Sequence, residues 1–136
     1  MSTVTDKLAM QSEKFKKGLE KLKEIDGEAG ENIIETLKEV SPDLARYTIE
    51  YPFGDIYSRP QLDLRSREIA AIAALATLGF ATPQLKVHIH AGLNVGLSET
   101  EIKEIIIQMS VYAGFPVALN AMNAAKEVFD ARKTKS

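Results

Sequence analysis

The 136-residue sequence contains no cysteine, and this absence removes several classes of chemistry at once. Without thiols the chain can form neither a disulfide framework nor a cysteine-ligated zinc site, and a thiol peroxidase mechanism is excluded. The charges nearly cancel, with 17 Lys and Arg against 19 Asp and Glu, so the basic surface of a nucleic-acid binder is also missing. The first 23 residues are polar and rich in lysine, without the apolar segment of a signal peptide. We therefore expect a cytoplasmic protein with no nucleic-acid partner.

Long uninterrupted apolar runs are also absent, although charge is scarce in two stretches. Residues 69–97 hold a single charged side chain, Lys86, and residues 105–125 hold none. Glycine and proline interrupt both stretches, whereas a membrane span needs roughly 18 uninterrupted apolar residues, so we expect no membrane partner. This is nevertheless more apolar surface than a chain of this length can easily cover. We therefore expect a homo-oligomer with helical interfaces.

Apolar residues recur with the period of a helix almost throughout, and no long stretch alternates with period two. This pattern predicts an all-α protein. We expect one domain over residues 1–136, with N-terminal helices over 1–50, an aromatic loop over 51–62 and core helices over 63–132. The loop is predicted because two prolines and Gly54 disfavour regular structure there.

The N-terminal helices are expected to bury one face each. An apolar stripe on the first of them consists of Leu8, Phe15, Leu19 and Leu22. Ser41 and Pro42 provide an N-cap and a first-turn proline for a later helix, whose Leu44 and Tyr47 are expected to face inward.

The second half carries explicit helix boundaries. Asp63 is expected to cap a helix that ends at Gly79, and Thr82-Pro83 starts a helix that ends at Gly96. The segment Ser98–Glu101 forms a capping box that opens a helix ending at Gly114, and Pro116 begins the last helix.

His88 and His90 are the only histidines in the chain. Two residues correspond to about 200° of rotation on a helix, so the two rings should point to nearly opposite sides. A shared metal ion is not predicted, because helical ligand pairs are three or four residues apart. Acid–base catalysis and a structural role, with one core and one surface histidine, both remain open.

Glu68 lies in the first turn of the helix that Asp63 caps. A carboxylate there can simply complement the helix dipole, or it can face inward beside a histidine and fix the tautomer of the ring. Arg59, Arg65 and Arg67 gather near the same helix start, as a solvated cluster or as partners of an anion.

Two tyrosines, Tyr57 and Tyr112, carry hydroxyl groups in apolar surroundings. Each could donate a hydrogen bond to a ligand or pack in the core.

Three segments resemble the carboxymuconolactone decarboxylase family. They are Gly54–Glu68, Gln84–Ala91 (followed by Gly96 and the helix start Glu101–Glu104), and Val111–Ala118. The resemblance extends over about residues 50–129. It implies an alkylhydroperoxidase-D-like all-helical bundle, commonly assembled as a trimer or hexamer, with active sites near subunit contacts.

The wider superfamily has a peroxidase branch that uses a Cys-x-x-Cys-x-x-x-His run. The corresponding positions here are Ala81, Gln84 and His88, so only the histidine is present. The resemblance therefore implies the decarboxylase branch, which needs no cofactor because the substrate's lactone takes up the electrons that carbon dioxide leaves behind. We expect decarboxylation of 4-carboxymuconolactone, or of a closely related carboxylated lactone, in aromatic catabolism.

On this hypothesis His88 is the acid–base residue, Glu68 orients it, and His90 is a second polar contact. The expected substrate-binding residues are Tyr57, Arg59, Arg65 and Tyr112. Two alternatives remain open: an acid–base isomerase or hydrolase acting on another lactone or enolisable acid, and a catalytically silent oligomeric binding protein.

Overall fold

The computed structural model describes residues 12–134, whose regular structure is entirely helical. The chain divides into two compact units, Met1–Leu62 and Asp63–Ser136. Within the described range, no helix combines the length and apolar character needed to cross a membrane. The all-α fold class predicted from the sequence is confirmed.

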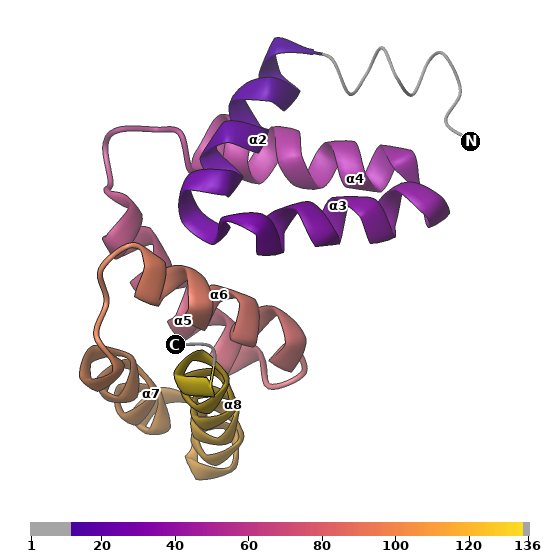
Figure 1. Cartoon of the computed structure of the whole chain (residues 1–136). Coiled ribbons are helices and arrows are strands. Elements are labelled where there is room, and N and C mark those ends of the chain that lie inside the picture. Colours follow the sequence, from indigo (N-terminus) through magenta and orange to yellow (C-terminus); the bar gives the residue numbers. More distant parts are fainter. Residues whose placement is uncertain (1–11, 135–136) are drawn as a thin grey trace. The chain divides into compact units, whose positions relative to one another are not determined.

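Among its described residues, the first unit contains the α-helices α2 (Glu13–Asp26), α3 (Glu28–Val40) and α4 (Pro42–Ile49) (Figure 1), followed by the π-helix η1 (Glu50–Ile56). Their core consists of Phe15, Leu22, Ile34 and Ile49, with Leu19 and Phe53 packed against it. The apolar stripe predicted for the first helix is therefore confirmed, apart from Leu8, which lies outside the described residues.

The π-helix η1 corrects the prediction of an aromatic loop that begins at residue 51. In an α-helix the ring of Pro52 would collide with the carbonyl four residues earlier, and the wider π turn relieves that collision. Gly54 then packs against α2, where an added Cβ would lie 2.9 Å from the carbonyl oxygen of Lys14. The glycine that predicted a loop is thus required by a close contact between helices.

A second correction concerns α4, whose apolar residues do not all face inward. Leu44 and Tyr47 are 51% and 54% exposed, while Ala45 and Ile49 are buried. Tyr47 instead lies beneath Arg46, whose guanidinium carbon is 4.5 Å from the ring centre. The cation–π contact gives the ring a favourable position at the surface.

The second unit contains α5 (Leu64–Leu78), α6 (Thr82–Asn94), α7 (Glu99–Ala113) and α8 (Phe115–Thr134). Helix α5 packs against each of the other three. The core residues, all from this unit, are Ile72, Ala76, Leu85, Ile89, Leu97, Ile102, Ile106, Ala118, Ala121, Ala124, Ala125, Val128 and Phe129.

The predicted boundaries of α5 and α7 are confirmed, whereas α6 ends at Asn94, two residues before the predicted Gly96, and α8 begins at Phe115, one residue before Pro116. Asp63 Oδ1 accepts a hydrogen bond of 2.7 Å from the backbone N–H of Ser66, and Gly79 ends α5 in the left-handed conformation with φ of 78°. Ser98 and Glu101 form the reciprocal capping box at the start of α7. Gly114, with φ of 95°, separates α7 from α8.

Large apolar side chains remain exposed where α5 ends and α7 passes into α8. A Cβ added at Gly79 would lie 3.6 Å from Val117, so the end of α5 is close to the start of α8. The exposed side chains, called the apolar patch below, are Leu78, Phe80, Val111, Tyr112, Phe115 and Leu119.

Candidate acid–base site

A histidine and a glutamate meet between α5 and α6. The Nδ1 atom of His88 lies 2.8 Å from Oε2 of Glu68. The glutamate side chain is 0% exposed and that of the histidine 22%, so one partner is inside the unit and the other reaches its surface. The contact expected from the sequence between these two residues is present.

Local packing explains why the two helices approach closely enough for this contact. On α5, Glu68 is one turn before the fully buried Ile72. It lies beyond the first turn of the helix, which contains no acidic residue, so the expected placement of this carboxylate in the first turn is wrong. On α6, Gly92 is one turn after His88, and an added Cβ there would lie 2.9 Å from Leu97 and 3.1 Å from Ile72. The missing side chain at Gly92 therefore lets the face of α6 that carries His88 pack against α5.

The buried carboxylate is bonded on one oxygen only. Its Oε1 atom has no hydrogen-bond partner within the part of the chain that the structure describes. Burying a carboxylate costs free energy unless charge or hydrogen bonds compensate, and His88 provides the compensating contact. With Nδ1 held in this way, Nε2 is the ring nitrogen through which His88 can exchange a proton with a substrate.

The second histidine faces a different helix. His90 Nδ1 lies 3.4 Å from Nη1 of Arg132 on α8, and the same Nη1 donates to Asn94 Oδ1 at 3.2 Å. The opposite orientation expected for His88 and His90 is therefore observed. The role of His90 as a catalytic contact stays a prediction.

The arginines predicted to hold a substrate carboxylate have separate surroundings. Arg65 pairs with Glu101, the residue that also accepts the backbone N–H of Ser98 in the capping box. Arg59 belongs to the first unit, where its side chain is exposed and its backbone N–H donates to the carbonyl of Ile56 at 3.1 Å. Their roles in binding remain predictions.

The two predicted tyrosines also differ. Tyr57 follows η1 and packs its ring against Phe53, with ring centres 5.3 Å apart. Tyr112 is 76% exposed and belongs to the apolar patch. Core packing therefore does not account for Tyr112, and its contact with a substrate stays a prediction.

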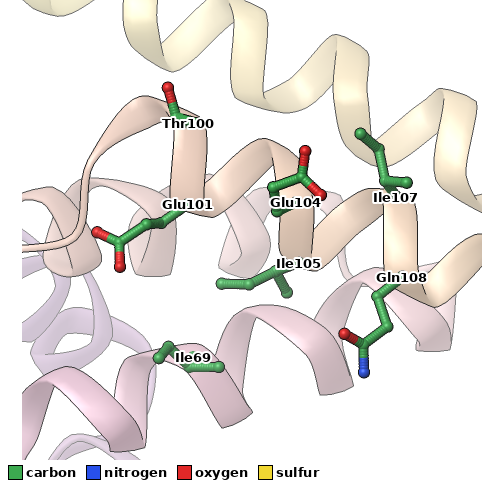
Figure 2. Close-up of a pocket in the computed structure, with 7 residues that line it drawn as sticks. All are labelled: Ile69, Thr100, Glu101, Glu104, Ile105, Ile107 and Gln108. Carbon is green, nitrogen blue, oxygen red and sulfur yellow. The ribbon is translucent and has the colours of Figure 1, made fainter.

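A surface cavity of about 360 Å³ lies between α5 and α7. Figure 2 shows Ile105 and Gln108 directed from α7 toward α5, where Ile69 lies. The remaining lining residues are Thr100, Glu101, Glu104 and Ile107. Neither His88 nor Glu68 lines this cavity. Sequence reasoning missed it because these side chains follow the ordinary polar and apolar pattern of an amphipathic helix.

Over residues 12–134, no group of three or more His, Asp and Glu side chains is close enough to hold a metal ion.

The fold and the site define a class of protein, an all-helical protein in which a buried glutamate contacts a partly exposed histidine. The carboxymuconolactone decarboxylase family matches residues 42–127. The chain is 36% identical to the 4-carboxymuconolactone decarboxylase of Acinetobacter baylyi over 118 residues, which cover 86% of this chain and 87% of that protein. The protein therefore belongs to the carboxymuconolactone decarboxylase family, as its motifs predicted.

Two further relatives cover less of the chain. An uncharacterised 15.0 kDa protein of Paracoccus denitrificans is 31% identical over 94 residues, covering 68% of this chain and 70% of that protein. A nitrosuccinic acid decarboxylase of Metarhizium robertsii is 33% identical over 78 residues, covering 54% and 50%. Since the relatives with an assigned activity are decarboxylases, the chain is an enzyme of the carboxy-lyase class.

Proposed function

We propose that this enzyme decarboxylates 4-carboxymuconolactone or a closely related carboxylated lactone in aromatic catabolism, with His88 as acid–base residue and Glu68 as its positioning residue. The observation that carries the proposal is the 2.8 Å contact between His88 Nδ1 and the fully buried Glu68. The similarity to the Acinetobacter decarboxylase supports this choice of substrate.

The chemistry of such a substrate fits a site built around one proton donor. In 4-carboxymuconolactone the departing carboxylate is attached to the ring carbon that the ring double bond links to the lactone carbonyl, so the carboxylate is vinylogous to that carbonyl. Loss of carbon dioxide therefore leaves an electron pair that spreads onto the lactone oxygen as a dienolate. Nitrosuccinic acid, the substrate in the name of the Metarhizium relative, likewise has a carboxylate beside a group that accepts electrons on oxygen. In both reactions the electron sink belongs to the substrate, so the reaction proposed here requires no cofactor.

The protein's contribution is then to place the substrate and to deliver a proton to carbon. Protonated His88 donates from Nε2 to the dienolate, while Glu68 holds Nδ1 and balances the charge of the imidazolium. We assign the substrate carboxylates to Arg59 and Arg65, because guanidinium groups bind carboxylates with paired hydrogen bonds. Arg65 already pairs with Glu101 through Nη2, so a substrate carboxylate would bind the remaining N–H groups of this exposed guanidinium or replace Glu101.

The test is carbon dioxide release and the ultraviolet change on 4-carboxymuconolactone, beside a panel of related carboxylated lactones. His88→Gln should lower kcat by about 10²-fold to 10⁴-fold, the usual contribution of a positioned acid or base. Glu127→Gln, which removes an exposed carboxylate paired with Lys86, is the control expected to retain activity. Undiminished turnover in a folded His88→Gln variant would reject the assignment, and no release from any carboxylated lactone would reject the function.

We also propose that the chain assembles with itself, as a trimer or hexamer, through the apolar patch. A surface without charge is best covered by another apolar surface, and a second copy of the chain supplies one.

A further inference from the structure

We infer that the His88–Glu68 pair also catalyses proton exchange and double-bond migration in unsaturated γ-lactones that carry no carboxylate. The inference rests on the proposed function, because it uses the proton-transfer half of that reaction in reverse. A group that gives a proton to the dienolate is also placed to take that proton from the same carbon.

The proton-transfer pair forms without the groups assigned to carboxylate binding. Glu68 and His88 are brought together within one unit, by the packing of α5 against α6 around Ile72 and Gly92. Arg65 is paired with Glu101 at the start of α7, and neither Arg65 nor Arg59 takes part in the contact between His88 and Glu68. The pair is therefore in position before any carboxylate binds. A lactone without a carboxylate can therefore react at the His88–Glu68 pair, although it binds more weakly.

The burial of Glu68 supports proton removal as well as proton delivery. When neutral His88 takes a proton at Nε2, the imidazolium forms 2.8 Å from a carboxylate with no exposed surface. The new positive charge compensates the buried negative charge, whose second oxygen has no hydrogen-bond partner among the described residues. Both charges are thus more favourable together than the carboxylate is alone.

The step balances without any added reactant. In a β,γ-unsaturated γ-lactone the C–H bond between the carbonyl and the ring double bond breaks, its proton passes to His88 Nε2, and its electron pair moves onto the lactone oxygen. The resulting dienolate is of the same kind as the one that loss of carbon dioxide leaves. A proton returned to the same carbon gives exchange with solvent, and a proton returned to the γ-carbon gives the conjugated isomer.

The experiment uses α-angelica lactone, a β,γ-unsaturated γ-lactone without a carboxylate, with the full-length protein in deuterated buffer. Proton NMR follows two signals, loss of the proton beside the carbonyl and growth of the conjugated isomer. We expect both to exceed the rate in buffer alone. His88→Gln should lower the enzymatic part by about 10²-fold or more. Glu68→Gln should lower it too, and Glu127→Gln should retain it. Circular dichroism verifies the fold of each variant.

The same preparation is assayed for decarboxylation, which makes the two proposals separable. Decarboxylation with no exchange above buffer overturns this inference and leaves the proposed function intact. Exchange without decarboxylation of any carboxylated lactone supports the inference and rejects the proposed substrate class. Exchange that persists in folded His88→Gln overturns the assignment to this pair, and the absence of both reactions overturns both proposals. The comparison of the wild-type protein with buffer shows whether the protein accelerates proton exchange, even if a variant fails to fold.

Discussion

Glu68 is a carboxylate without exposed surface, and a change confined to its charge isolates what it does for His88. Glu68→Gln keeps the size of the side chain but removes the negative charge beside Nδ1. We expect kcat for decarboxylation to fall by about 10²-fold or more, with a smaller change in KM, because the imidazolium loses its counter-charge.

A merely structural role for Glu68 would predict a different pattern. It would lower thermal stability and leave the pH profile of the remaining activity unchanged. We therefore expect the profile of kcat against pH to differ between wild type and Glu68→Gln. Identical profiles, together with a lowered Tm, would contradict the positioning role.

Asp63 provides a pH-dependent contribution to stability. Hydrogen bonds from the backbone N–H and the side chain of Ser66 hold the pKa of Asp63 below its ordinary value of 3.8. A carboxyl group with a lowered pKa in the folded state stabilises the fold above its unfolded pKa, and this contribution is lost as the pH falls below 3.8 through the folded value.

The corresponding measurement is thermal unfolding of Asp63→Ala between pH 7 and pH 3. We expect Tm to be lower than in the wild type by a few degrees at pH 7, since α5 loses its N-cap. The difference should shrink as the pH falls below 3.8. Asp63→Asn retains an acceptor but cannot ionise, so its Tm should stay above that of Asp63→Ala by a nearly constant amount.

At the residue scale, the contact between Glu68 and His88 was predictable from the sequence, whereas the surroundings of the predicted substrate-binding arginines were not. Glu68 and His88 stand out because ionisable side chains are rare within residues 68–97. The pairing of Arg65 with Glu101 could not be predicted, because these residues are 36 positions apart on different helices. Glu101 also has a local role in the capping box of α7. When a side chain such as Glu101 is already accounted for by a local role, the sequence does not indicate that it also contacts a distant residue.

At the scale of elements, the crossing of α2 and η1 depends on two glycines. A Cβ at Gly18 would lie 2.3 Å from the carbonyl oxygen of Ile49 and 3.0 Å from the backbone nitrogen of Gly54. Because these are backbone atoms, the helices would have to move apart. Gly18→Ala should therefore destabilise the protein by about 1–3 kcal/mol, despite the better helix propensity of alanine.

Chemical denaturation followed by circular dichroism measures this change. Lys17→Ala, at the neighbouring exposed position of α2, is the matched control and should remain within about 0.5 kcal/mol of the wild type. A Gly18→Ala variant as stable as this control would show that the crossing tolerates a side chain.

The helices with local end signals were predictable, and the others were less so. Asp63, Ser98 and Gly114 act within one turn of their own helix, so their effects can be inferred from sequence alone. In η1, the close contact between Gly54 and α2 is not local, so the sequence did not indicate that this glycine lies in a helix. Tyr47 was misplaced for a different reason: its contact with Arg46 is local, but the helical apolar pattern does not distinguish a ring in a cation–π contact at the surface from a ring in the core.

At the scale of the whole molecule, the apolar patch leads to a prediction about assembly. The double variant Phe80→Asp, Phe115→Asp places charge on two side chains that are 80% and 73% exposed. If the patch joins copies of the chain, sedimentation should detect a trimer or hexamer in the wild type and a monomer in the variant.

Val40→Asp is the matched control for this experiment. Val40 is 84% exposed but belongs to α3 in the first unit, so the same kind of change there should leave the assembly intact. A wild-type protein that sediments as a folded monomer at micromolar concentration would contradict the assembly. If Val40→Asp also loses assembly, the assignment of the subunit interface to the apolar patch is contradicted.

The burial of Glu68 also gives the second unit a built-in reporter of its opening. Carbodiimide reagents couple amines to carboxyl groups that solvent reaches, and in the native protein they should modify surface residues such as Glu104 within the first minutes. Glu68, with no accessible surface, can react only in molecules whose helices have transiently parted. Mass spectrometry of the peptide that contains Glu68 would therefore measure the rate at which Glu68 is modified, and that rate reports how often α5 and α6 separate in the wild-type protein.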